Sequence, residues 1–401
     1  MRMSADSLSR YLEATLAAAA AADRRRVRRT ISAPIPQQPT RILVDGRLCT
    51  AFCSNDYLGL SGDPRIAAAF AGAAAQYGVG SGASHLVCGH GPEHAALEEA
   101  LADFLDRERA ILFSTGYMAN LGIAAALVGR GDLVVEDRLN HASLIDAGLA
   151  TGARFQRYAH ADAASADAVL AKHPARHRLL ATDGVFSMDG DVAPLVELAE
   201  ICSERDAWLV IDDAHGFGVL GAHGRGSVEA HGLSASQAPV LMATLGKAIG
   251  VFGAFVAGSR DLIDVLVQRA RTYIYTTALP PAVAAAARQA LELVRTESWR
   301  RDHLHELIGR FRSGAAALGL TLLPSGTPIQ PLVLGSERRA VAASRHLLAA
   351  GLYVPAIRPP TVPAGSSRLR ITLSAAHSAQ DVARLLETLA EWQRTAAGRD
   401  A

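Results

Sequence analysis

Short apolar runs alternate with longer amphipathic stretches over the middle of the chain, from about residue 54 to residue 280. Helix-like segments such as Met118–Leu127 and Pro194–Arg205 separate most of these runs. Continuous apolar strands that alternate with helices are typical of a mainly parallel sheet covered on both faces. The pattern therefore predicts an α/β domain, with candidate strands at Ala110–Phe113, Leu133–Val135, Leu179–Thr182, Trp208–Ile211, Val240–Ala243 and Ala254–Ala257.

The N-terminal part of the chain has a different pattern. Asp6–Arg29 is rich in alanine and ends in arginines, which favours a helix with basic side chains in its last turn. Prolines from Pro34 to Pro39 break this helix, and a linker leads to a short strand-like run at Arg41–Val44. We expect residues 1–53 to form an N-terminal helix and linker.

The C-terminal part reads as a second, smaller domain. A long helical stretch follows Pro280-Pro281, and strand-like pieces occur at Gln330–Leu334 and Leu369–Leu373. A final helix is predicted from Ala379 to about Ala396. This order favours an α+β domain, so we expect a large domain over residues 54–290 and a small one over residues 291–401.

Charge and composition narrow the class of protein. Lys and Arg number 40 against 39 Asp and Glu, so the net charge of +1 argues against a protein that coats nucleic acid or an anionic membrane. Apolar runs such as Ile249–Gly258 are shorter than the roughly 18 residues needed to span a bilayer. The four cysteines form no C-x-x-C pair, and neither they nor the histidines have a metal-ligand spacing. We expect a cytoplasmic enzyme without a metal site.

A lysine follows the fifth candidate strand, in the run Thr244–Ile249. A Gly-Lys pair after a strand suggests a P-loop, but that loop needs Ser or Thr after the lysine and an earlier glycine. Ala248 and Leu241 stand at those two positions, which excludes the P-loop. Small neighbours leave room for a bulky group to approach the amine of Lys247, although a solvated loop lysine has the same pattern.

A strand-end aspartate and a glycine-containing turn accompany this lysine. Asp212 ends the fourth candidate strand, at the sheet edge where α/β proteins bind ligands, and His215 follows it. Gly116 and Tyr117 begin a helix after the first candidate strand, where backbone N–H groups suit a phosphate dianion. Taken alone, Asp212 could be a capping aspartate, His215 a structural histidine, and the segment at Gly116 an ordinary turn.

Together these features indicate pyridoxal phosphate. In that case Lys247 forms the Schiff base with the cofactor, Asp212 keeps the pyridine nitrogen protonated, and the turn at Gly116 binds the phosphate. The set of three is much more specific than any one member.

Further stretches carry a family resemblance, and they run from residue 54 to the C-terminal helix: Ser54–Leu60, Gly80–His85, Asp137–Ser143, Asp183–Gly190, Ala356–Gly365 and Arg368–Leu373. With them the chain resembles the α-oxoamine synthases, a family of fold-type I pyridoxal-phosphate enzymes. The resemblance implies a large domain with a mainly parallel seven-stranded sheet, a smaller α+β C-terminal domain and a homodimer.

The resemblance also implies a role for each matching residue. Lys247 carries the cofactor and moves protons, Asp212 pairs with the pyridinium, and His141 stacks on the ring and faces the substrate carboxylate. Phosphate contacts fall to Thr244, Gly116 and Tyr117, and contacts to the phenolic oxygen fall to Ser187 and His215. The substrate-binding residues are Arg25, His141, Thr361 and Arg370, with Arg370 as a carboxylate fork.

One position departs from the family pattern. The family places an arginine near the end of the first helix, usually after leucine, to contact the acyl substrate. Here five arginines occur between Arg24 and Arg29. Arg25 fits by register, Arg28 is the alternative, and a merely solvated basic helix end is a third reading.

The stretch Ala356–Gly365 is most similar to family members that condense L-alanine with a pimeloyl thioester and release CO2, in biotin synthesis. The acyl carrier is coenzyme A or acyl carrier protein. Two alternatives stay open: an oxoamine synthase that uses glycine and a shorter acyl group, such as a 2-amino-3-ketobutyrate ligase, and a non-catalytic sensor that keeps the fold.

Overall fold

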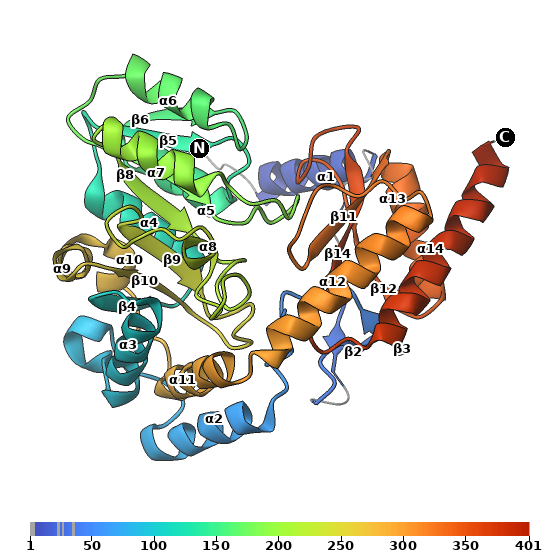
Figure 1. The fold of residues 1–401 in the computed structure, drawn as a ribbon, viewed down its shortest axis with the longest axis horizontal. Helices are drawn as coiled ribbons and strands as arrows, with labels where there is room; N and C mark the ends of the chain where they lie inside the picture. The colour runs from blue at the N-terminus through green and yellow to red at the C-terminus, as the bar shows by residue number, and fades with distance from the viewer. Residues whose placement is uncertain (1–4, 22–24, 26–27, 34–36, 401) are drawn as a thin grey trace.

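The computed structural model describes residues 5–21, 25, 28–33 and 37–400. Two lobes lie side by side in Figure 1, and the larger one contains a seven-stranded sheet. The sheet order is β4 (Arg109–Phe113), β10 (Ala254–Gly258), β9 (Val240–Thr244), β8 (Trp208–Asp212), β7 (Arg178–Asp183), β5 (Leu133–Asp137) and β6 (Arg154–Tyr158).

This sheet is mainly parallel, as predicted. The pairs β9–β8, β8–β7, β7–β5 and β5–β6 are parallel, and β10 alone runs antiparallel to its two neighbours, β4 and β9. All six candidate strands are present. The sequence pattern missed β6, because this edge strand alternates Phe155 with Arg154 and Gln156 and has no continuous apolar run.

Helices cover both faces of the sheet. Successive residues of β8 show this directly, since Leu209 and Ile211 pack into one apolar core while Val210 packs into the other. The helices of this lobe are α2 (Pro64–Tyr77), α3 (Pro92–Leu105), α4 (Gly116–Leu127), α5 (Ala142–Ala150), α6 (Ala163–Lys172), α7 (Leu195–Glu204), α8 (Ser227–Ala230), α9 (Arg260–Arg269), α10 (Arg271–Ile274) and α11 (Pro281–Thr296), with a π-helical turn at His85–Gly89.

The smaller lobe contains two short sheets. One is antiparallel, in the order β11 (Ile329–Gly335), β14 (Ser367–Thr372) and β13 (Ala356–Ile357). The other has the order β1 (Ile31–Ser32), β2 (Arg41–Val44), β3 (Arg47–Ala51) and β12 (Leu352–Tyr353). The helices α12 (Trp299–Ala317), α13 (Glu337–Ala349) and α14 (Ala379–Asp400) complete an α+β lobe (Figure 1).

The N-terminal expectation was wrong in two respects. The helix α1 covers Ala5–Ala21, and the described residues of the arginine run, Arg25 and residues 28–30, are not helical. Arg24 and Arg26 lie outside the described residues. A run of like charges three and four residues apart disfavours a helix, and Arg29 instead pairs with Asp45 at 3.1 Å. The segment expected as a linker also contains β1 and β3, and β3 pairs in parallel with β12 of the small lobe.

The predicted division at residues 54–290 and 291–401 stays a prediction, and residue 290 falls inside the continuous helix α11. Within the part of the chain described above, no helix combines the length and the apolar character that a membrane span requires.

Candidate active site

The strand order brings the predicted site residues to one edge of the sheet. Asp212 ends β8, and in the parallel register it lies directly beside Asp183, which ends β7. Thr244 ends β9 on the other side of β8, and Lys247 follows three residues later. Because the carboxyl ends of parallel strands meet at one edge, segments far apart in sequence share a site there.

A cavity of about 180 Å³ lies at this edge. Every residue predicted to bind the cofactor lines it: Gly116, Tyr117, His141, Ser187, Asp212, His215, Thr244 and Lys247. The lining also includes residues to which the sequence analysis gave no role: Ser143, Asp183, Ala214 and Met242.

Asp212 is a buried carboxylate held by two donors. Its Oδ2 accepts a hydrogen bond from Nδ2 of Asn120 at 2.7 Å, and its Oδ1 accepts from the backbone N–H of Ala214 at 3.0 Å. These bonds fix the direction of the carboxylate. A fixed buried anion of this kind suits a protonated ring nitrogen.

Lys247 is largely buried in the same cavity. Burial lowers the pKa of its amine to about 8, although the negative charges of Asp212 and Asp183 oppose the shift. Near neutral pH a larger fraction of the amine is therefore uncharged than in a solvated lysine. An uncharged amine can attack a carbonyl carbon and can accept a proton. Lys247 is therefore chemically suited both to carry the cofactor and to move protons.

Asp183 is a site residue that the sequence analysis quoted only as part of a family-like stretch. Burial, and then the neighbouring charge of Asp212, raise the pKa of its carboxyl well above the usual value. Its Oδ2 accepts from the backbone N–H of His141 at 3.0 Å and so holds the start of α5 against β7. The sequence feature that could have identified Asp183 was its position, because it ends the strand next to the one that ends in Asp212.

His215 is buried and oriented by a tyrosine from the first family-like stretch. Its Nδ1 lies 2.7 Å from the hydroxyl of Tyr57, which donates to Oδ1 of Asn55 at 3.2 Å. Burial and the nearby charge of Lys247 hold the pKa of His215 well below its usual range, so the ring is neutral at pH 7. Tyr57 and Asn55 were not predicted as site residues.

The turn before α4 has the geometry expected of a phosphate site. Thr115 caps the helix by accepting from the backbone N–H of Met118, and Gly116 and Tyr117 form its first turn beside the cavity. Thr244 lines the same cavity, and its hydroxyl donates to the carbonyl of Gly253 at 2.9 Å. A helix N-terminus together with a hydroxyl suits a dianion.

The residues predicted to bind the substrate lie in different environments, one buried and the others exposed. Arg370, on β14, is buried, and its guanidinium donates to the carbonyl of Ser187 and to Oδ1 of Asn55, so the small lobe contacts a residue that lines the cavity. Thr361 is exposed in a turn where its N–H donates to the carbonyl of Arg358 at 3.1 Å. Arg25 and Arg28 are exposed. None of Thr361, Arg370 and Arg25 is among the residues that line the cavity.

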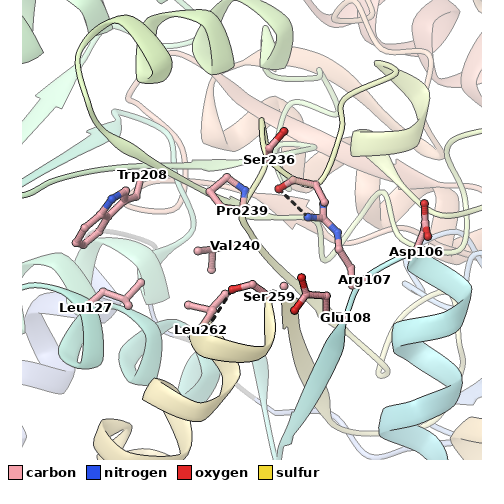
Figure 2. Close-up of a pocket in the computed structure, with 12 residues that line it drawn as sticks. Asp106, Arg107, Glu108, Leu127, Trp208, Ser236, Pro239, Val240, Ser259 and Leu262 are labelled. Atoms are coloured by element: carbon pink, nitrogen blue, oxygen red, sulfur yellow. Dashed lines mark hydrogen bonds between the residues drawn. The ribbon is translucent and has the colours of Figure 1, made fainter.

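A larger hollow of about 540 Å³ lies at the opposite edge of the sheet, where β8 and β9 begin. Figure 2 shows Trp208 and Leu127 at one end of it and Arg107 at the other. The polar groups there already have partners: Arg107 donates to the carbonyls of Ala235 and Ala238, and Glu108 accepts from the N–H of Arg260. No predicted site residue lines this hollow.

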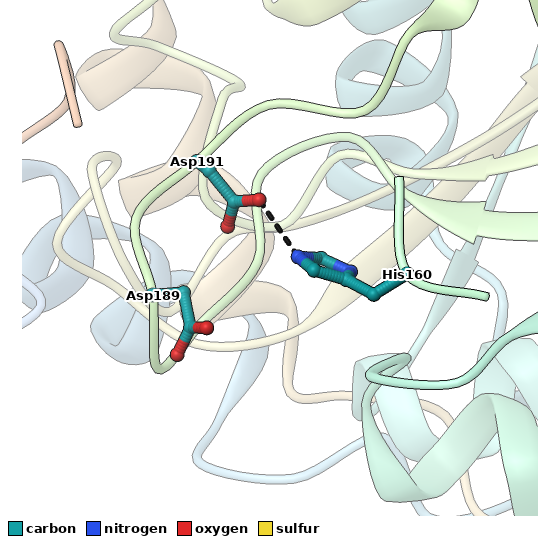
Figure 3. A group of neighbouring side chains, drawn as sticks. All are labelled: His160, Asp189 and Asp191. Carbon is teal, nitrogen blue, oxygen red and sulfur yellow. Dashed lines mark hydrogen bonds and ion pairs between the residues drawn. The ribbon is translucent and has the colours of Figure 1, made fainter. Parts of the chain in front are cut away.

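His160, Asp189 and Asp191 form a cluster whose spacing would suit a metal ion (Figure 3). However, the ring of His160 already bonds Asp137 through Nδ1 at 3.0 Å and Asp191 through Nε2 at 2.8 Å. Asp189 pairs with Arg368. Burial alone would lower the pKa of His160, but the hydrogen bonds and charges of Asp137 and Asp191 raise it to about 10, so the ring is an imidazolium that bridges two carboxylates.

The donor set at the small cavity fits pyridoxal phosphate. It combines an amine with a lowered pKa for the aldehyde, a buried carboxylate for the ring nitrogen and a helix N-terminus for the phosphate. The arrangement agrees with the combination expected from the sequence.

Comparisons with known proteins give a consistent picture. The sequence model of the family "Aminotransferase class I and II" matches residues 48–389. An 8-amino-7-oxononanoate synthase of Cellvibrio japonicus is 57% identical over 97% of this chain and 98% of its own length. One of Methylococcus capsulatus is 60% identical over 94% of this chain and 96% of its own.

Solved structures show the same fold. A serine palmitoyltransferase from S. paucimobilis with bound PLP and myriocin superposes with a TM-score of 0.90, at 30% identity over 98% of this chain and 99% of its own. An 8-amino-7-oxononanoate synthase from Francisella tularensis gives a TM-score of 0.76, at 30% identity over 87% of this chain and 99% of its own.

Proposed function

The chain belongs to the class I and II aminotransferase family, whose members include pyridoxal-phosphate enzymes of fold type I, and on that premise we propose that it makes 8-amino-7-oxononanoate. The reaction condenses L-alanine with a pimeloyl thioester and releases CO2 and the free thiol carrier, a step of biotin synthesis. The observation that carries this proposal is similarity over nearly the whole chain to synthases of that name, at 57–60% identity.

The chain's own residues divide the work around the cofactor, which when bound supplies the electron sink for the carbanion at the α-carbon of alanine. Asp212 would hold the protonated ring nitrogen, and Ser187 and His215 would bond the phenolic oxygen. Thr244 and the turn at Gly116 would hold the phosphate. This assignment is supported by the common cavity that these residues line.

Proton movement is assigned to Lys247. The pKa of its amine, about 8, is close to working pH, so Nζ can take the α-proton of alanine and later return a proton to the product. His141 would face the substrate carboxylate, and Arg370 would act as its fork. The guanidinium of Arg370 bonds Asn55 through two N–H groups at 3.3 Å, long enough to exchange this partner for a carboxylate.

The acyl substrate needs contacts beyond the cofactor cavity. A pimeloyl group ends in a second carboxylate, which requires a cation or hydrogen-bond donors at its far end. We assign this contact to Arg25, or to Arg28 if the register is shifted, with Thr361 near the substrate. Coenzyme A and acyl carrier protein are both possible carriers.

We further propose a cytoplasmic homodimer. Val79, Val87 and Tyr275 are 86%, 77% and 71% exposed, which is unusual for large apolar side chains. Their segments lie side by side, because the N–H of Ala278 bonds the carbonyl of Ala83 at 3.0 Å and His85 stacks on Tyr273. Adjacent exposed apolar side chains mark a protein–protein contact, and a second copy of the chain is the proposed partner.

Substrate competition tests the proposal against its nearest alternative. Purified holoenzyme is offered alanine or glycine together with pimeloyl-coenzyme A or acetyl-coenzyme A, and the amino-ketone products are identified by mass spectrometry. We expect a strong preference for alanine with the pimeloyl thioester. Equal turnover of glycine with the acetyl thioester would instead indicate a 2-amino-3-ketobutyrate ligase, and no turnover of any pair would favour a sensor.

A further inference from the structure

Two side chains outside the predicted set connect two of the predicted site residues. Asn120, on α4, is 1% exposed, and its Nδ2 donates to Oδ2 of Asp212 at 2.7 Å and to Oγ of Ser143 at 2.8 Å. Oγ of Ser143 in turn lies 2.8 Å from Nδ1 of His141. A continuous chain of hydrogen bonds therefore runs from Asp212 to His141.

The chemistry of these groups fixes the direction of each proton. The amide nitrogen of Asn120 can only donate, so Oγ of Ser143 must accept from it. Oγ is left with its own proton and a second lone pair, so the hydroxyl alone could either donate to Nδ1 of His141 or accept from it. The backbone N–H of Ser143 settles the choice, because it donates to Nδ1 at 3.3 Å and a proton on Nδ1 would place one N–H against another. Nδ1 is therefore an acceptor, and the hydroxyl proton of Ser143 points to it.

The orientation of the Asn120 amide is equally determined. Rotating the amide by half a turn would place Oδ1 against the carboxylate of Asp212, so that two acceptors would face each other. In the observed orientation the buried Oδ1 has no hydrogen-bond partner within the described part of the chain. The charge-assisted bond from Nδ2 to Asp212 offsets the cost of that unpaired acceptor.

We propose that Ser143 and Asn120 are positioning residues that hold His141 as the neutral tautomer protonated on Nε2, while Asn120 also fixes the carboxylate of Asp212. The other ring nitrogen of the exposed His141, Nε2, is then a permanent donor. A donor at this position suits the carboxylate of an amino-acid substrate, and this last step alone rests on the proposed function.

The tautomer can be measured directly on holoenzyme that carries ¹⁵N-labelled histidine. Solid-state ¹⁵N spectra of microcrystals separate pyridine-like from pyrrole-like ring nitrogens, and a His141→Gln variant identifies the signals of His141 by their loss. We expect a pyridine-like Nδ1 and a pyrrole-like Nε2. A pyrrole-like Nδ1 in the unaltered enzyme would overturn the proposal.

Asn120→Asp should move the two signals toward each other. The carboxyl oxygen that replaces Nδ2 accepts from the Ser143 hydroxyl whether it is ionised or shares its proton with Asp212. Ser143 then has no proton for Nδ1, so only the long backbone bond still opposes a proton there, and the tautomer protonated on Nδ1 becomes populated. Unchanged His141 signals in folded Asn120→Asp would contradict the role of Asn120.

Ser143→Ala keeps the test decisive if Asn120→Asp does not fold. It removes the hydroxyl donor and leaves only the long backbone bond, so both tautomers should be populated. The dissociation constant for L-alanine should rise roughly two- to tenfold, as expected for the loss of one hydrogen bond. Unchanged signals in this variant would overturn the role of Ser143.

Ser259→Ala is the matched control. Its hydroxyl caps α9 by accepting from the N–H of Leu262 at 3.2 Å, away from the cavity, so the His141 signals should not change. The two proposals also fail separately. If the signals behave as expected but alanine and pimeloyl-coenzyme A give no product, the tautomer assignment stands and the proposed function falls.

Discussion

Replacing His160 by glutamine should make the loop of residues 184–191 open more easily, by roughly 2–3 kcal/mol at pH 7. This loop carries Ser187 at the cavity and Asp191, which the ring of His160 holds at 2.8 Å. The same ring bonds the fully buried Asp137 at 3.0 Å. Figure 3 shows the contact with Asp191. A glutamine amide is uncharged and cannot reproduce both contacts.

The magnitude follows from the pKa of His160. Burial alone would lower it, but hydrogen bonds and charges from Asp137 and Asp191 raise it from 6.5 to about 10. A shift of that size corresponds to about 5 kcal/mol without screening. The side chain is 25% exposed, and solvent screening reduces the figure by roughly half.

The sign of the pH dependence is also determined. A group whose pKa rises on folding stabilises fully below its unfolded pKa and loses the effect as pH approaches the folded value. The difference between the two proteins should therefore be largest below about pH 6.5 and should shrink steadily as the pH rises toward about 10.

Hydrogen–deuterium exchange of the peptide that contains the loop measures this difference. In the loop the N–H of Phe186 bonds the carbonyl of Asp191 at 3.0 Å, and the N–H of Gly190 bonds the carbonyl of Phe186 at 2.8 Å. Protection of these amides should fall roughly 30- to 150-fold in His160→Gln at pH 7. His305→Gln, at an exposed position on α12, is the control. Equal protection in wild type and His160→Gln, or a difference that grows with pH, would refute the reasoning.

Three further predictions test the site. Borohydride reduction followed by peptide mapping should place the pyridoxyl group on Lys247. A label on Lys172, the chain's one other lysine, would contradict the assignment. Replacement of Lys247 by alanine should abolish turnover. Asp212→Asn should slow exchange of the α-proton of alanine in deuterated water, measured by NMR without thioester, because a neutral amide does not keep the ring nitrogen protonated; unchanged exchange would remove Asp212 from this role. Arg25→Ala, or Arg28→Ala if the register is shifted, should weaken thioester binding in titration calorimetry and leave alanine binding unchanged. If both variants bind the thioester as tightly as wild type, neither arginine contacts the acyl substrate.

The main sheet and the cofactor cavity were largely predictable from the sequence. Central parallel strands are buried on both faces, so their apolar runs are continuous, and the residues at their carboxyl ends meet at one edge. Asp212, Lys247 and the turn at Gly116 each follow such a strand, and the structure brings them to one cavity. Asp183 satisfies the same rule, yet its role depends on the order of the strands, which the pattern of apolar runs does not give.

Features that depend on tertiary contacts were not predictable. The edge strand β6 has too mixed a pattern, and the non-helical backbone at Arg25 reflects charge repulsion that helix propensity alone ignores. Asn120 and Tyr57 reach the site only through side-chain hydrogen bonds to residues distant in sequence, Asp212 and His215, which no local pattern reveals. Arg370 bonds residues more than 180 positions away, a contact that only the packing of the two lobes creates.

The position of each carbon of alanine in the product tests the central claim most directly. Holoenzyme is incubated with pimeloyl-coenzyme A and L-alanine labelled with ¹³C either at the carboxyl carbon or at the α- and β-carbons. The account predicts 8-amino-7-oxononanoate that keeps the α- and β-carbon labels, while the carboxyl label leaves as CO2, and it predicts no product with Lys247→Ala. Carboxyl label retained in the product, or product formed by Lys247→Ala, would contradict it.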